Sequence, residues 1–151
     1  HVQSLQQVTE AQFGGRNQSY LDRSPVSGKL NPIAPPVQLS MGEDSSARTT
    51  TVLGMAYQGP PGRVHGGFVA TLLDHLMGYA AGTVGTLVFT RSLTVEYDHA
   101  VPLFEELDIE ARVDQVDGRK IWVLGEIRAA GSVVARARGV WVLARTNPDS
   151  G

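Results

Sequence analysis

The sequence contains no cysteine, and its 151 residues include no apolar run near the roughly 20 residues that a membrane-spanning helix needs. The first absence excludes disulfides, thiolate metal sites and a cysteine nucleophile, and it is compatible with a reducing compartment. We therefore expect a cytoplasmic protein with no membrane insertion. The formal net charge is only -2, which gives no reason to expect a nucleic-acid partner. Four histidines without cysteine offer no convincing ligand set, so we expect neither metal nor cofactor.

The chain divides into two compositional parts. Its length suits one domain with a sizeable core. Four of the eight prolines fall before residue 45, where only residues 4–13 have a helical apolar stripe. We therefore predict an extended or loop segment over 1–45 with a short helix, one domain over 46–146, and a tail over 147–151.

The order of the predicted elements defines the fold class. Residues 47–57 resemble a strand, and a turn rich in proline and glycine separates them from a long helix, Gly66 to Ala81, which Gly82 and Gly85 end. Alternating patterns then predict four strands, over 89–97, 107–113, 121–128 and 133–144. Because no βαβα alternation is present, the sequence predicts an α+β fold in which a curved antiparallel sheet surrounds one central helix.

The first of the four strands has two distinct faces. Strict alternation places Leu93, Val95 and Tyr97 on its apolar side. The same alternation places Thr90, with Ser92, Thr94 and Glu96, on the polar side.

The predicted helix is apolar around almost its whole circumference, which is typical of a buried helix. The exceptions are Thr71, Asp74, His75 and Gly78, which form one narrow stripe. A carboxylate costs several kcal/mol to bury in its charged form without a partner. The stripe is therefore either a solvated seam or the floor of a site, and we expect His75 to be a hydrogen-bonded helix residue.

The start of the helix offers a second candidate feature. The backbone N–H groups of Gly66 and Gly67 are free of intrahelical partners and suit an anion or a developing oxyanion, although the glycines could simply ease a tight turn. Gly66 and Asp74 are eight residues apart, about 12 Å along a helix. If both act in one reaction, they come from two copies of the chain, which predicts antiparallel helices across a two-fold axis.

Three segments of the sequence form a specific combination of motifs. The first runs Gly-Arg-Val-His-Gly-Gly-Phe-Val-Ala-Thr-Leu-Leu-Asp and ends at Asp74. The second is Phe-Thr-Arg-Ser-Leu-Thr-Val-Glu-Tyr, residues 89–97, with Pro102 and Leu103 after it. The third is the turn Val-Asp-Gly-Arg-Lys, residues 116–120. Together these segments resemble the hotdog-fold acyl-CoA thioesterases of the phenylacetate-degradation and 4-hydroxybenzoyl-CoA thioesterase type. The resemblance covers about residues 46–145 and implies a hotdog fold.

The resemblance also implies roles for single residues. Asp74 matches the carboxylate that acts as general base or nucleophile, and Thr90 matches a residue that positions the attacking water. Gly66, with Gly67 beside it, matches the amide that polarises the thioester carbonyl, and His65 flanks that oxyanion hole. Where some relatives carry an asparagine six residues before the histidine, this chain has Gly59, with Gln58 adjacent.

Coenzyme A carries phosphates, so basic side chains near the entrance of the site matter. Candidates are Arg91, Arg119 and Lys120, and Met77 and Phe89 are expected to line the acyl pocket. The implied function is hydrolysis of an acyl- or aryl-CoA thioester by a homodimer or a dimer of dimers with sites at the dimer interface. Two alternatives stay open: an acyl-thioester hydratase or dehydratase that pairs His65 with Asp74, and a non-catalytic acyl-CoA-binding module.

Overall fold

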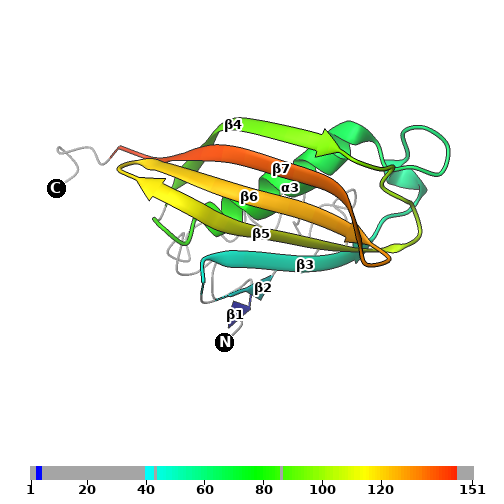
Figure 1. The fold of residues 1–151 in the computed structure, drawn as a ribbon, viewed down its shortest axis with the longest axis horizontal. Helices are drawn as coiled ribbons and strands as arrows, with labels where there is room; N and C mark the ends of the chain where they lie inside the picture. Colours follow the sequence, from blue (N-terminus) through cyan, green and yellow to red (C-terminus); the bar gives the residue numbers. More distant parts are fainter. Residues whose placement is uncertain (1–2, 5–39, 43, 86, 146–151) are drawn as a thin grey trace.

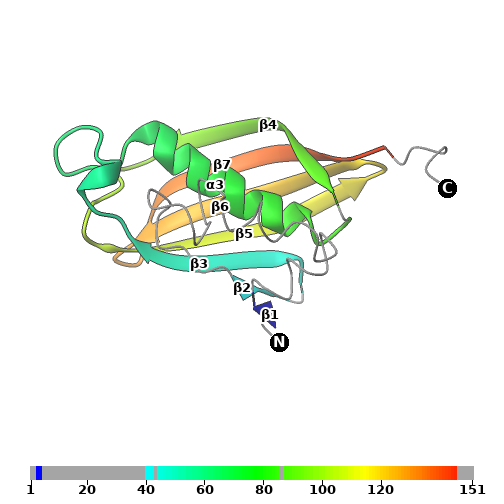
Figure 2. The same cartoon turned by 180° about the vertical axis from the view of Figure 1, so that it is seen from behind.

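One long helix lies across one face of a seven-stranded antiparallel sheet (Figures 1 and 2). The computed structural model describes residues 3–4, 40–42, 44–85 and 87–145. The strand order is β1-β2-β3-β5-β6-β7-β4, which leaves β4 at one edge. The elements are β1 (Gln3–Ser4), β2 (Ser40–Met41), β3 (Ser46–Val52), the short 3-10 helix η1 (Met55–Tyr57), α3 (Gly66–Ala81), β4 (Val88–Tyr97), β5 (Glu106–Asp117), β6 (Lys120–Ala129) and β7 (Ser132–Leu143).

The predicted fold class is confirmed. A strand, a helix from Gly66 to Ala81 and four antiparallel strands follow one another as expected, and this is the arrangement of a hotdog fold. Gly118, with φ of +57°, occupies the predicted hairpin turn between β5 and β6, where a side chain would be strained. No helix in the described part of the chain is long and apolar enough to span a membrane.

The strand predicted over 47–57 is too long. β3 ends at Val52, because its pairing partner β5 begins there, with Val52 opposite Glu106. The chain then leaves the sheet and forms η1, and the ring of Tyr57 packs on Phe68 of α3 with ring centroids 4.5 Å apart. The sheet also gains β1 and β2 ahead of residue 46. Apart from Ser4, which belongs to β1, the helix predicted over 4–13 lies outside the described residues, and the domain division stays a prediction.

The hydrophobic core lies between α3 and the inner face of the sheet. Eight of the sixteen helix residues are buried, and they face the strands β3 to β7. Gly125 of β6 lets α3 pack close against the sheet, because a Cβ atom there would lie 2.8 Å from Sδ of Met77. This tight packing fixes how α3 is seated on the sheet.

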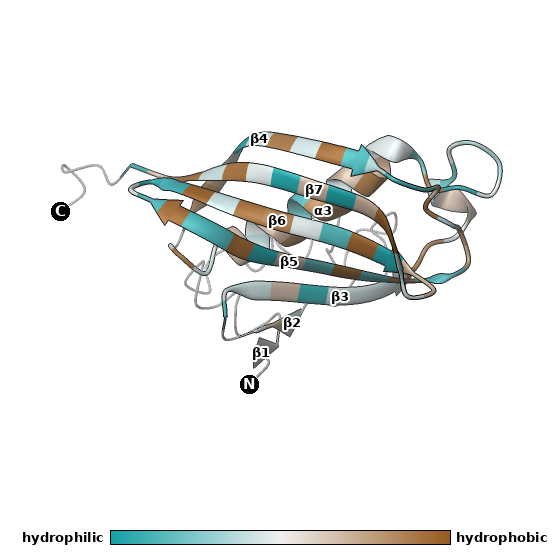
Figure 3. Ribbon diagram, viewed as in Figure 1, coloured by the Kyte–Doolittle hydropathy of each residue, from teal (hydrophilic) through white to brown (hydrophobic). Residues whose placement is uncertain are grey.

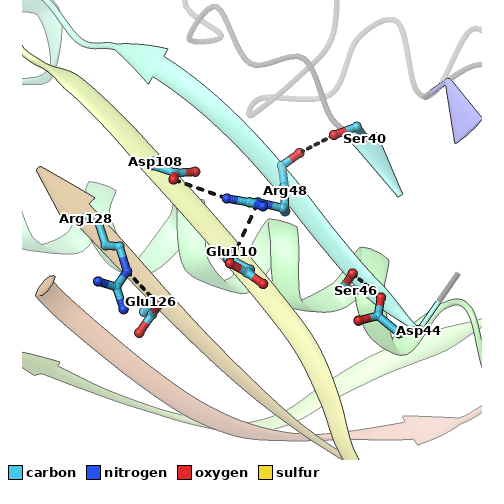
Figure 4. Close-up of polar contacts among 8 residues, drawn as sticks. All are labelled: Ser40, Asp44, Ser46, Arg48, Asp108, Glu110, Glu126 and Arg128. Atoms are coloured by element: carbon cyan, nitrogen blue, oxygen red, sulfur yellow. Dashed lines mark hydrogen bonds and ion pairs between the residues drawn. The ribbon is translucent and has the colours of Figure 1, made fainter. Parts of the chain in front are cut away.

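The outer face of the sheet is largely polar. Along β4 to β7 hydrophilic and hydrophobic residues alternate, as expected for strands with one buried side (Figure 3). Arg48 of β3 reaches across to Asp108 at 3.4 Å and to Glu110 at 3.7 Å on β5 (Figure 4). These pairs are exposed, so each contributes at most about 1 kcal/mol.

Candidate active site

The central polar contact of the candidate site joins β4 to the helix. The hydroxyl of Thr90 donates a hydrogen bond of 2.8 Å to Oδ1 of Asp74. Asp74 is half-buried in the middle of α3, and its second oxygen, Oδ2, accepts no hydrogen bond from a described residue. The carboxylate is therefore held by one oxygen and open to a further hydrogen-bond donor at the other.

A β-bulge places Thr90 on the helix side of the sheet. The register between β4 and β7 shifts between Thr90 and Ser92, which inserts Arg91 as an extra residue. Thr90 therefore pairs with the buried Trp141 and faces α3, together with Tyr97. The prediction from strict alternation, which placed Thr90 on the opposite face from Tyr97, is wrong for this reason.

The start of α3 carries the second half of the candidate site. Nδ1 of His65 accepts a hydrogen bond of 3.0 Å from the N–H of Gly67, so His65 is the N-cap of the helix. The N–H of Gly66 has no acceptor among the described residues. Of the two predicted donors, only Gly66 is free to bind a ligand in this conformation.

Tyr97 is a site residue that the sequence analysis missed. From the far end of β4, its hydroxyl donates a hydrogen bond of 2.6 Å to the carbonyl oxygen of Gly66. The pattern alone identified Tyr97 only as an apolar-side residue. A tyrosine hydroxyl on the inner face of a sheet usually forms a hydrogen bond, and this preference was the one signal in the sequence for a role of Tyr97.

His75 lies beside Asp74 on the polar stripe of the helix. Its ring meets that of Tyr79 edge to face, with centroids 5.0 Å apart. Burial lowers the pKa of His75 to about 4, because surrounding protein replaces the water that would solvate the imidazolium. His75 is therefore neutral near pH 7.

Two of the predicted phosphate-binding cations, Arg119 and Lys120, lie near the Thr90 end of β4, together with Phe89, which was predicted to line the acyl pocket. Nε and Nη2 of Arg119 donate to the carbonyl oxygen of Leu143 at 3.1 and 2.8 Å, which ties the β5–β6 turn to the end of β7. Lys120 and Phe89 both pair with Val142, so they share a row on the outer side of the sheet.

The third predicted cation, Arg91, and the second predicted pocket residue, Met77, do not belong to this row. Arg91 is exposed at the bulge. Met77 lies in the core with 0% exposure. The binding roles of all five residues stay predictions.

The loop before the helix explains the departure at Gly59. A Cβ atom at Gly59 would lie 2.8 Å from Cα of His65, closer than real Cβ contacts. The side-chain oxygen of Gln58 accepts a hydrogen bond of 3.0 Å from the N–H of Gly62. An asparagine at position 59 would therefore displace the backbone of His65, and Gln58 is engaged in the turn.

A hollow of about 400 Å³ lies on the outer face of the sheet, away from both half-sites. Its charged walls include Glu96, Glu110, Arg112 and Arg138. Within the described residues no three His, Asp or Glu side chains are grouped to hold a metal ion.

Comparison with known families identifies the domain. The family model described as "Thioesterase superfamily" matches residues 61–136, which include α3, β4, β5 and β6. This chain belongs to the thioesterase superfamily. The match contains both halves of the candidate site, from His65 to Asp74 and from Thr90 to Tyr97.

This thioesterase superfamily member is similar to several characterised or solved proteins. It is 29% identical over 96 residues to acyl-coenzyme A thioesterase THEM4 of Rattus norvegicus, which covers 64% of this chain and 41% of the relative. A crystal structure of a thioesterase superfamily protein is 44% identical, has a TM-score of 0.77, and covers 81% of this chain and 61% of that one. The Escherichia coli PaaI protein of the phenylacetic acid degradation operon, at 18% identity and a TM-score of 0.68, shares the fold over 72% of this chain and 80% of its own. The chain thus spans about two fifths of the rat relative.

Proposed function

We propose that this chain hydrolyses acyl-CoA thioesters to a free acid and coenzyme A. The observation that carries the proposal is the Asp74 carboxylate, held by the hydroxyl of Thr90 on an otherwise apolar helix of a thioesterase superfamily domain. The relatives named acyl-coenzyme A thioesterase support the choice of coenzyme A thioesters over other esters.

Each half of the candidate site has one task in the reaction. The halves are the Asp74–Thr90 pair and the Gly66 amide at the start of α3. Oδ2 of Asp74 takes a proton from water, whose oxygen attacks the thioester carbonyl carbon. The N–H of Gly66 binds the oxyanion of the tetrahedral intermediate, which the positive end of the helix also stabilises. Collapse of the intermediate breaks the carbon–sulfur bond, and the thiolate of coenzyme A leaves. In the alternative course Oδ2 attacks the carbonyl itself, releases the thiolate, and water then hydrolyses the mixed anhydride.

The complete site requires two copies of the chain. Gly66 and Asp74 are about 12 Å apart along one helix, too far to meet one carbonyl. Two features support a homodimer in which each site combines Asp74 of one copy with Gly66 of the other. The polar stripe of α3 is only half-buried, and β4 presents its unpaired edge to a partner. The same proposal includes the pairing of two such dimers, which sedimentation tests. It also includes a cytoplasmic location, which cell fractionation tests.

Release of free thiol from a panel of acyl-CoAs, from short to long chains with one aryl member, tests the proposal. We expect Asp74→Asn and Asp74→Ala to lower kcat by about 10²- to 10⁴-fold, because both remove the base. Asp108→Asn, an exposed carboxylate on the outer face, is the matched control and should leave kcat unchanged.

Three results would contradict the proposal. The first is no thiol release from any member of the panel. The second is full activity in both Asp74 variants. The third is a change in enoyl-CoA absorbance without thiol release, which would indicate a hydratase.

A further inference from the structure

The peptide group between Gly66 and Gly67 is held at both ends by side chains. Its carbonyl oxygen accepts from the hydroxyl of Tyr97 at 2.6 Å, and its N–H donates to Nδ1 of His65 at 3.0 Å. One partner comes from the loop before the helix and the other from β4, 31 residues after Gly66.

A glycine pair needs this kind of external support. Without Cβ atoms, the backbone dihedrals on either side of the Gly66–Gly67 peptide can change at little cost. The preceding peptide is fixed differently, because the carbonyl oxygen of His65 accepts from the N–H groups of Phe68 and Val69 at 2.9 and 3.0 Å. Together these bonds fix the peptides on both sides of Gly66 and therefore the direction of its own N–H.

We infer that Tyr97 is a positioning residue that aligns the Gly66 N–H for the developing oxyanion. This inference rests on the proposed thioester hydrolysis. The ring of Tyr97 also backs Gly66, since a Cβ atom there would lie 3.6 Å from the hydroxyl oxygen and 3.7 Å from the ring. Tyr97 is 51% exposed, so water partly competes for the same carbonyl and the effect of its hydroxyl is moderate.

Tyr97→Phe tests the inference, because it removes the hydroxyl and keeps the ring. We expect kcat to fall about tenfold while KM changes by less than about twofold, since the hydrogen bond serves the transition state. Thr94→Val removes a hydroxyl from the same strand, at a position that borders the outer hollow, and should leave both constants unchanged.

A spectroscopic measurement separates positioning from loss of structure. A 2-oxoalkyl-CoA keeps the carbonyl but cannot be hydrolysed, and we expect its carbonyl stretch to be shifted to lower frequency when bound to the wild type. In Tyr97→Phe the frequency should return toward that of the free analogue, while an S-alkyl-CoA thioether of equal length, which has no carbonyl, should bind with unchanged affinity.

The outcomes distinguish this inference from the proposed function. If the wild type releases thiol and Asp74→Asn does not, the proposed function holds. An unchanged kcat and an unchanged carbonyl frequency in Tyr97→Phe would then overturn the inference alone. Equal losses in kcat and in thioether binding would also overturn it, because they would indicate a structural role.

Discussion

Replacing Gly66 by proline deletes the one N–H group that the mechanism requires. Gly66 is the first residue of α3, where a backbone N–H has no partner within the helix and proline is well tolerated. The preceding residue, His65, has φ of -58° and ψ of 131°, the extended conformation that proline imposes on its neighbour. The added Cβ would lie 3.6 Å from the hydroxyl of Tyr97, an ordinary contact. The variant should therefore fold with wild-type stability.

The expected effect on activity is large. Removal of one oxyanion donor costs about 10²- to 10³-fold in kcat, or about 3–4 kcal/mol of transition-state stabilisation. Gly66→Ala is the matched control, because it adds the same Cβ and keeps the N–H, and its kcat should stay within a few-fold of wild type. Thiol release and thermal melting of both variants are the measurements. Equal kcat values for proline and alanine would refute the role of the Gly66 amide.

The same variant tests whether two copies share each site. We expect Gly66→Pro and Asp74→Asn each to be nearly inactive alone, but a mixed dimer holds one site with both changes and one site with neither. Co-expression with random pairing should restore up to about a quarter of wild-type activity. If activity does not return although mixed dimers form, each chain carries its own complete site.

Two further outcomes concern stability. The pKa of His75 is about 4 in the folded chain and about 6.5 in the unfolded chain. Between these pH values only the unfolded state binds a proton at this side chain, so the free energy of unfolding falls as pH decreases from 6.5 toward 4. The free energy of unfolding, measured with urea, should be about 2 kcal/mol lower at pH 5 than at pH 8 because of this group. The same pH dependence in His75→Gln would contradict the assignment to His75. Gly59→Ala should lower the free energy of unfolding by about 1–3 kcal/mol because its Cβ would meet the His65 backbone at 2.8 Å, whereas Gly54→Ala, 3.8 Å from the Phe104 ring, should be tolerated. Similar melting temperatures for the two alanine variants would show that the loop relaxes.

Local pattern was enough to predict the helix and the order of the strands. The bounds of α3 follow from Gly66 at its start and Gly82 at its end, and both signals lie within the segment itself. The excess length predicted for β3 arose because β3 ends opposite the first residue of its antiparallel partner β5, which lies more than 50 residues away in the sequence. Sequence pattern contains little information about such pairing limits.

The candidate site was less accessible to prediction for the same reason. The resemblance led to Asp74 and Thr90, and the structure brings them within 2.8 Å. The pattern could not reveal that His65 occupies the N–H of Gly67, because the cap depends on the rotamer of the imidazole. Tyr97 was missed because its acceptor is the backbone carbonyl oxygen of Gly66. Every residue has such a carbonyl, so the residue type of the acceptor gives no signal.

The bulge in β4 has a consequence for which changes in chain length the protein can accept. Thr90 and Tyr97 are seven residues apart, an odd separation that would point them to opposite faces of a regular strand, and the one extra residue turns both toward α3. Deleting Arg91 would shorten the separation to six residues, so a regular strand without the bulge would still direct both side chains toward α3, whereas regular alternation at the present length would turn one of them away. Between these positions the length of the strand and the bulge are therefore linked, so a homologue that keeps both contacts with one residue fewer has a regular strand, and one residue can be lost only together with the bulge.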